Sequence, residues 1–193
     1  EYVLGEVKKY GLDEAQIEQY PADGKTRYFM FQSFDGWDGE SGVAWMTSPY
    51  REKVCDFAEM PACLCRWSNS AHAKGDLIYV GEGRPEDFAG KVVKNKIVLT
   101  SSDPSSVHEE AVINRGALGV ISFYYPRPVD YPDAVERDGI SHYETRDGRK
   151  STFAFKISTR KGQELVRLLE AGQKLTMEVD VKARVYPERK RVV

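Results

Sequence analysis

The chain has 193 residues, of which 41% are hydrophobic and 30% charged, and its formal net charge is −2. This composition is typical of a globular domain with its own core and excludes a disordered chain. The small negative charge argues against nucleic acid as a partner, because nucleic-acid-binding domains present a basic face. No apolar run approaches the roughly 20 residues of a membrane span, and residues 1–10 lack the apolar stretch of a signal peptide.

The first part of the chain is predicted to contain a helix and several short strands. Apolar residues at helical spacing predict a helix over residues 1–11, namely Val3, Leu4, Val7 and Tyr10. Gly11 is a natural end for this helix. Residues 27–34 and 42–47 have the composition of strands, and a short helical piece is predicted over residues 52–57.

The middle of the chain has a clearer pattern of strand, helix and strand. Continuous apolar runs predict strands at Leu77–Val80, Ile97–Leu99 and Leu118–Phe123. The helix between the last two strands begins either at Asp103, which a proline follows, or at Ser106, which forms a capping box with Glu109. Gly116 suits the left-handed residue that ends a helix. This order of elements predicts a parallel pair of strands with a right-handed crossover.

The last part of the chain is predicted to contain a strand, a helix and a long strand. Residues 153–157 form the first strand, and the helix is capped by Ser158 or Thr159 and ended by Gly172. Residues 175–185 alternate between apolar and polar side chains, which predicts a strand with one buried and one solvated face. Together these elements predict an α/β or α+β fold, built as a small partly open β-barrel or two-layer sheet flanked by short helices.

A long polar segment over residues 126–151 connects two of the predicted strands. A loop of this length is either functional or mobile. Aromatic and arginine side chains are common anchors at protein interfaces. We therefore expect a contact surface made of Tyr124, Tyr125, Arg127, Tyr131 and Tyr143. The large side chains of Trp45 and Trp67 are interpreted instead as core residues.

The cysteines are Cys55, Cys63 and Cys65, an odd number that excludes complete intramolecular pairing. With His72 they could form a zinc site, but structural zinc sites favour two to four residues between paired cysteines, and only Leu64 separates Cys63 from Cys65. Buried thiols, or a disulfide from Cys55 to one of the other two, are the alternatives. We therefore assign no metal ligand to this chain.

A catalytic triad can be drawn from Ser101, Asp103 and His108. All three lie on one short segment around the start of a helix, which leaves no geometry for one residue to orient the next. We assign no catalytic residue.

Several pieces of residues 74–185 resemble the protease-associated (PA) domain. The matching pieces are Asp76–Gly81, Lys94–Leu99, Ala111 with Gly116–Ile121, Phe155–Ser158, and Gly162 with Leu165. The family usually has glycine where this chain has Asn95, and asparagine also tolerates a left-handed conformation. The segments before residue 74, including residues 20–24, are similar to the region that precedes the PA insert of secreted zinc aminopeptidases (metallopeptidase family twenty-eight).

The resemblance implies three parts. Residues 1–73 would be an N-terminal region that belongs partly with a missing catalytic domain, residues 74–185 the PA core, and residues 186–193 a truncated linker. The dizinc site of the family follows the insert, so the resemblance implies no cofactor in this fragment and zinc in the catalytic domain. The histidines of this chain are His72, His108 and His142, and none lies in the His-x-Asp pair that supplies the family's first zinc ligand.

The resemblance implies a non-catalytic domain of a parent zinc metalloaminopeptidase. This domain would cover the active site, or mediate substrate access and protein interaction. Its expected partners are the catalytic peptidase domain of the same polypeptide and peptide or protein substrates, and its expected location is extracellular or in the cell envelope. The alternative is a self-standing protein- or ligand-binding module without a peptidase partner.

Overall fold

The computed structural model describes residues 2–140, 150–186 and 189–192, and in the last of these ranges only the backbone. The chain divides into two compact units. One consists of Glu1–Trp37 with Val185–Val193, and the other of Asp38–Arg184.

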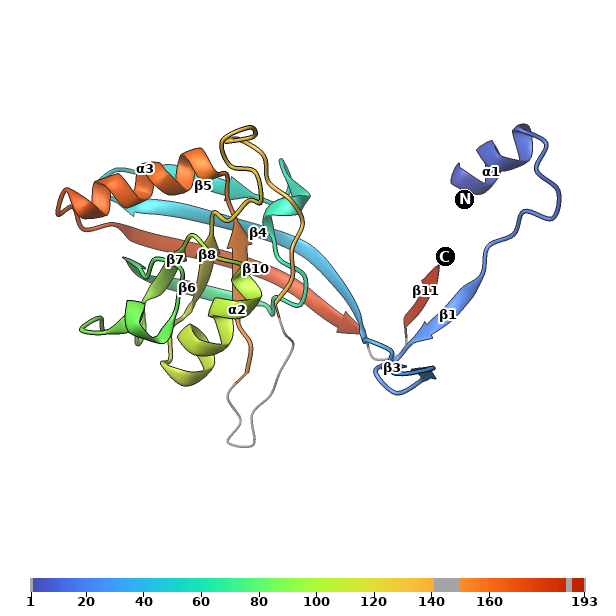
Figure 1. The fold of residues 1–193 in the computed structure, drawn as a ribbon, viewed down its shortest axis with the longest axis horizontal. Coiled ribbons are helices and arrows are strands. Elements are labelled where there is room, and N and C mark those ends of the chain that lie inside the picture. Colours follow the sequence, from blue (N-terminus) through green and yellow to red (C-terminus); the bar gives the residue numbers. More distant parts are fainter. Residues whose placement is uncertain (1, 141–149, 187–188, 193) are drawn as a thin grey trace. The chain divides into compact units, whose positions relative to one another are not determined.

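A seven-stranded sheet forms the framework of the larger unit (Figure 1). In spatial order its strands are β5 (Glu52–Asp56), β4 (Gly36–Ser48), β10 (Thr176–Tyr186), β6 (Ala71–Tyr79), β7 (Ile97–Thr100), β8 (Gly119–Ser122) and β9 (Phe153–Lys156). The strands from β6 to β9 are parallel, whereas β4 pairs with β5 and β6 pairs with β10 in antiparallel fashion. The predicted parallel pair is therefore confirmed as β7 and β8, and β6 and β9 extend it on both sides.

Helical segments lie in the connections between the strands of this sheet. They are η1 (Pro61–Cys63), η2 (Pro85–Phe88), α2 (Pro104–His108), the π-helical η3 (Glu109–Asn114) and α3 (Thr159–Glu170). The Asp103 side chain accepts hydrogen bonds from the backbone N–H groups of Ser105 and Ser106, so the first of the two predicted helix starts is right and the Ser106 start is wrong. Ser158 caps α3, as one of the two predicted caps.

The core lies on both faces of the parallel strands, because every residue of β7, β8 and β9 is buried. On one face, Val98 and Val120 belong to a buried cluster with Val107 and Val112 from α2 and η3. The predicted alternation of β10 is confirmed over its central part, where Val179 and Val181 are buried and the residues between and after them are exposed. Helices and strands are thus mixed in a two-layer α+β arrangement, as the sequence predicts.

Two local predictions are wrong, and a third is right but too short. Residues 52–57 were expected to form a helix, but Glu52–Asp56 is strand β5, because pairing with β4 satisfies its backbone groups. The strand expected at residues 42–47 extends over all of Gly36–Ser48. Residues 27–34 form not one strand but a hairpin of two short strands, β2 (Arg27–Tyr28) and β3 (Phe31–Gln32).

The smaller unit contains α1 (Tyr2–Lys9), β1 (Gln19–Ala22), the β2–β3 hairpin and β11 (Arg189–Val192). The helix predicted over residues 1–11 is confirmed as α1, and all eight of its residues are described and none is buried. Strand β11 pairs with β1 in antiparallel fashion, within the segment interpreted from sequence as a linker. The boundary expected between residues 73 and 74 lies inside β6, and the three-part division into 1–73, 74–185 and 186–193 stays a prediction.

Candidate functional site

Four of the five predicted contact residues lie on the segment that follows β8, which we call the tyrosine segment (residues 124–133). The rings of Tyr125 and Tyr131 meet edge to face, with their centroids 6.3 Å apart. The Arg127 guanidinium lies 5.4 Å from the centroid of Tyr131 and pairs with Asp130. The structure thus brings three predicted residues together on one surface. Tyr143 lies outside the described residues.

The tyrosine segment is attached to the protein at both ends. At its start, Tyr124 lies over the ammonium group of Lys156, which is 5.2 Å from the ring centroid. At its end, Asp133 accepts two hydrogen bonds from the Arg160 guanidinium, at 2.6 and 2.9 Å. Tyr131 itself is 50% exposed, so its ring is available to a partner while the backbone around it is held.

A buried charge cluster lies beneath Tyr124, where the parallel strands end. The Lys156 side chain is only 1% exposed, and its ammonium group is 3.2 Å from the carboxylate of Asp138. Asp138 in turn hydrogen-bonds the side chain of Asp103. Burial raises the pKa of Asp103, and the neighbouring Asp138 carboxylate raises it further. Both causes favour the protonated form of Asp103, and the buried Lys156 ammonium group offsets the negative charge of Asp138.

His108 is buried at the end of α2. Its Nε2 accepts a hydrogen bond from the Thr152 backbone N–H at 3.3 Å, and its Nδ1 has no partner among the described residues. Burial lowers the pKa of His108 to about 4. The imidazole is therefore neutral at physiological pH and acts as an acceptor that holds the start of β9.

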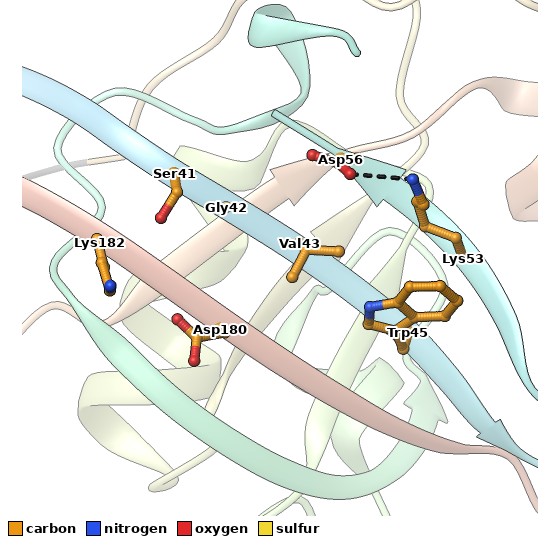
Figure 2. A pocket seen from close by; sticks show the side chains of 8 residues that line it. All are labelled: Ser41, Gly42, Val43, Trp45, Lys53, Asp56, Asp180 and Lys182. Atoms are coloured by element: carbon orange, nitrogen blue, oxygen red, sulfur yellow. Dashed lines mark hydrogen bonds and ion pairs between the residues drawn. The ribbon is translucent and has the colours of Figure 1, made fainter. Parts of the chain in front are cut away.

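An open groove of about 480 Å³ lies on the face of the sheet opposite the core, across strands β5, β4 and β10 (Figure 2). We call it the Trp45 groove. Trp45 and Val43 provide its apolar surface, and the Arg51 guanidinium lies 4.4 Å from the Trp45 ring centroid. Trp45 is therefore not a core residue, and its interpretation as one is wrong. Trp67 is partly buried and packs against the main core cluster.

Charged side chains of both signs surround the Trp45 groove. On the β5 side, the Lys53 ammonium group pairs with Asp56 at 3.0 Å and with Glu59 at 2.5 Å. On the β10 side, Asp180 is 3.2 Å from Nδ1 of His72, and Lys182 lies further along the same strand. The groove combines an aromatic wall with mixed charges, which is a composition typical of surfaces that bind polar ligands or peptides.

The cysteines are free thiols in this structure. Cys63 and Cys65 are buried and Cys55 is half-buried, and the thiols of Cys55 and Cys63 interact with each other. This contact and burial raise the pKa of the Cys55 thiol. Among the described residues, no group of three or more His, Cys, Asp and Glu side chains is placed to hold a metal ion. No helix in the described part of the chain is long and apolar enough to cross a membrane.

The smaller unit exposes apolar side chains on the hairpin formed by β2 and β3. Phe29 and Met30, at the tip between β2 and β3, are 101% and 83% exposed. The base of the hairpin is held by Asp23, whose carboxylate accepts hydrogen bonds from the backbone of Lys25 and Thr26. These backbone hydrogen bonds hold the pKa of Asp23 well below its usual range.

Sequence reasoning missed both the Trp45 groove and the buried charge cluster. A signal for the cluster is present in Phe153–Lys156, where a lysine ends an apolar run of the buried type. A lysine in such a run needs an acidic partner, and Asp138 is that partner. The groove had no signal of this kind, because β10 lies far from β4 and β5 in the sequence.

No protein-family profile matches the sequence, and no curated protein matches it. Solved structures do match. An aminopeptidase from Aneurinibacillus sp. strain AM-1 matches over 99% of this chain and 39% of its own, with a TM-score of 0.60 and 21% identity. A peptidase M28 precursor from Shewanella amazonensis matches over 99% of this chain and 42% of its own, with a TM-score of 0.56 and 11% identity.

The zinc aminopeptidase BSAP from Bacillus subtilis is similar over 99% of this chain and 38% of its own, with a TM-score of 0.55 and 14% identity. At these identities the likeness shows the fold. This chain spans about two fifths of the length of these aminopeptidases and peptidases, and its fold is that of the matched part of each.

Proposed function

We propose that this chain is the non-catalytic, PA-type domain of a zinc aminopeptidase. In this proposal it covers the active site of a catalytic domain in the same polypeptide, limits the access of substrates, and contacts peptide or protein substrates. The parent enzyme would hold zinc in its catalytic domain and act outside the cell or in the cell envelope.

The observation that carries the proposal is the fold likeness over nearly the whole chain. The Aneurinibacillus aminopeptidase matches 99% of this chain with only 39% of its own length. The remaining part of such a chain is long enough for a separate catalytic domain.

The surface of the smaller unit supports a partner in the same polypeptide. Large apolar side chains of the β2–β3 hairpin and the loop after it are mostly exposed, namely Phe29, Met30, Phe31 and Phe34. Contiguous exposed apolar side chains of this kind mark interfaces with other proteins or domains. We propose that this hairpin packs on the catalytic domain.

The tyrosine segment supports a contact with substrate. Tyr131 and Arg127 stack on each other on a segment that the Arg160–Asp133 ion pair holds in place. Aromatic and arginine side chains on a fixed backbone bind partners at low cost in conformational entropy. We propose that this segment contacts the part of a peptide that extends beyond the scissile bond.

The test is made in the full-length enzyme, with Tyr131→Ser on the tyrosine segment. We expect kcat/KM on a long peptide to fall several-fold and kcat/KM on a small aminoacyl chromogenic substrate to stay unchanged. Tyr50→Ser is the matched control, since Tyr50 is 47% exposed and Tyr131 is 50% exposed. Equal losses on both substrates, or none on either, would contradict the proposed contact.

The alternative function, a self-standing binding module, is favoured by the Trp45 groove, which needs no peptidase partner to bind a ligand. Two observations discriminate between the functions. A reading frame that continues beyond Val193 into a His-x-Asp segment supports the peptidase parent, whereas a stop codon there supports the module. The chain alone, assayed with zinc on aminoacyl chromogenic substrates, should show no turnover, and turnover that survives purification controls would exclude the proposal.

A further inference from the structure

We propose that Cys55 and Cys63 are a disulfide-forming pair, which closes when the folded protein meets a small-molecule disulfide such as oxidised glutathione. This inference concerns a modification of the larger unit and is independent of the proposed function. It rests on the way in which β5 and the segment after it are folded.

Strand pairing directs the Cys55 side chain toward the core. Cys55 on β5 lies opposite Ala44 on β4, and Ala44 is fully buried. Directly opposite residues of an antiparallel pair present their side chains on the same face of the sheet. Cys55 therefore faces the inner side of the sheet, although it belongs to an edge strand.

Two consecutive turns return the chain from Cys55 to the same place. The backbone N–H groups of Glu59 and Met60 both donate to the carbonyl of Asp56, at 3.1 and 2.9 Å. The N–H of Cys63 then donates to the carbonyl of Met60 at 3.0 Å. The turns fold residues 56–63 back onto β5, so that η1, which ends with Cys63, packs against the strand that carries Cys55.

The third cysteine has a different environment. The backbone N–H of Cys65 donates to the carbonyl of Ala154 on β9 at 3.0 Å, and its side chain belongs to the buried cluster that includes Val98 and Ala111. Cys65 is thus held by the parallel strands, whereas Cys63 is held by the turns next to β5. This difference selects Cys63 as the partner of Cys55.

The reaction is a thiol–disulfide exchange in two steps. The Cys55 thiolate attacks one sulfur of oxidised glutathione, which forms a mixed disulfide and releases one glutathione thiolate. The Cys63 thiolate then attacks the Cys55 sulfur of the mixed disulfide and releases the second glutathione. Two protein thiols lose two protons and two electrons, and one glutathione disulfide becomes two glutathione thiols.

The environment of the pair predicts a slow reaction that accelerates with pH. Cys63 is fully buried, whereas Cys55 is half-buried and lies on edge strand β5, so we assign the first attack on the oxidant to Cys55. The pKa of the Cys55 thiol is raised by its interaction with Cys63 and by burial, so little thiolate is present at neutral pH.

A disulfide between Cys55 and Cys63 would link the edge strand β5 to the segment that follows it. Strand β5 carries Lys53 and Asp56, which form one side of the Trp45 groove. A link from Cys55 to Cys63 closes the loop that contains the two turns and lowers the conformational entropy of the unfolded chain. Oxidation is expected to raise the melting temperature by several degrees and to fix this wall of the groove.

The experiment treats the folded chain with a mixture of oxidised and reduced glutathione at pH 8, and blocks the remaining thiols with iodoacetamide. Digestion with trypsin alone leaves all three cysteines on one peptide between Lys53 and Arg66. A second cleavage after Glu59 separates Cys55 from the other two. The variants Cys63→Ala and Cys65→Ala are matched, because both side chains are fully buried.

The expected result is one disulfide per chain in the unmodified protein and in Cys65→Ala, seen as the loss of two hydrogen atoms and as a Cys55–Cys63 linked peptide. Cys63→Ala is expected to keep both of its thiols. The proposal is overturned if the unmodified protein keeps three thiols, if it stops at a glutathione adduct on Cys55, or if Cys63→Ala joins Cys55 to Cys65 at the same rate. The peptide map of the unmodified protein decides the matter even if a variant does not fold.

Discussion

At the scale of single residues, the protein is defined by a few polar side chains that are buried at the ends of the parallel strands. Lys156 is buried against Asp138, and Asp103 shares a hydrogen bond with that same carboxylate. His108 is buried at the end of α2, and its Nε2 accepts a hydrogen bond from the Thr152 backbone N–H. The pKa values of Asp103 and His108 differ between the folded and unfolded states. Both groups therefore make stability depend on pH.

His108 is expected to destabilise the fold in acid. Its pKa falls from 6.5 to about 4 on folding, so between these values the unfolded state binds more protons than the folded state. Stability from this group is therefore present above pH 6.5 and is lost as the pH falls toward 4. The full effect is roughly 3 kcal/mol. Urea unfolding across this pH range should show the loss.

The His108→Gln variant separates this effect from general acid denaturation. Glutamine keeps an acceptor for the Thr152 N–H and cannot be protonated in this range. We expect the decline between pH 6.5 and 4 to shrink by most of that amount. His72→Gln is the control, because the His72 side chain is 73% exposed, and it should leave the pH profile unchanged. A variant profile parallel to that of the unmodified protein would show that His108 is not the group that titrates.

Asp103 is expected to act in the opposite direction. Its pKa is raised on folding by burial and by Asp138, so the folded state holds the proton more tightly than the unfolded chain. Stability from this group is therefore present below the unfolded pKa of about 3.9 and is lost as the pH rises from there through the raised folded pKa.

Asp103→Asn should remove this loss. Asparagine still caps α2 and can donate a hydrogen bond to Asp138 without taking up a proton. We expect the variant to gain on the order of 1 kcal/mol at pH 7 relative to the unmodified protein, and no gain at pH 3. Asp133→Asn is the control: the pKa of Asp133 is lowered by Arg160, so its loss should not stabilise the protein at pH 7. A destabilised Asp103→Asn at pH 7 would contradict the raised pKa of Asp103.

At the scale of elements, close packing between α3 and the end of β8 fixes the position of the helix. A Cβ atom on Gly162 would lie 2.1 Å from Cγ of Phe123 and 2.2 Å from its Cβ. Such contacts force the helix away from the sheet, and Gly162→Ala should cost about 1–3 kcal/mol despite the better helix propensity of alanine. The midpoint of urea unfolding measures this loss.

Gly5→Ala in α1 is the matched control for that substitution. Gly5 is also helical, but nothing lies within 4 Å of the Cβ that alanine would add. Only the gain in helix propensity remains there, so the stability of the larger unit should not fall. If Gly162→Ala is as stable as Gly5→Ala, the helix is not seated where the structure has it.

Elements were predictable from sequence where burial and periodicity agree. The alternation of β10 and the continuous apolar runs of β7 and β8 identified these strands, because each has one environment along its length. The two-residue strands β2 and β3 are too short to show any period. In β4 the large apolar side chains of Val43 and Trp45 face outward, while the inward positions include Gly42 and Ala44. The hydrophobic pattern of β4 therefore predicts that Val43 and Trp45 face the core, whereas they line the groove.

The candidate site was less predictable than the fold. The tyrosine segment could be found because its aromatic residues are close together in the sequence. The charge cluster joins Asp103 and Asp138, which come from two different connections, with Lys156 at the end of β9, and they meet only because the parallel strands end at one edge. Spacing along a single sequence carries no information about such a meeting.

At the scale of the whole molecule, the hydrophobic core belongs to one of the two units. In the part of the chain whose burial is described, every buried hydrophobic residue lies between Ala44 and Val181. The large apolar side chains of the smaller unit are exposed instead of buried, and its strands β1 and β11 pair with each other. The free energy of folding should therefore come almost entirely from the larger unit.

The fragment Asp38–Arg184 is accordingly expected to fold by itself. Its sheet keeps all seven strands, although β4 and β10 lose their ends, and its core keeps every buried hydrophobic residue of the described chain. We expect a cooperative urea transition with the same midpoint as that of the full chain, and a slope reduced only in proportion to the surface of the removed residues. The complementary residues 1–37 should show no transition when isolated. A fragment that fails to fold, or a midpoint that drops well below that of the full chain, would mean that the smaller unit is part of the folding core rather than a surface prepared for another domain.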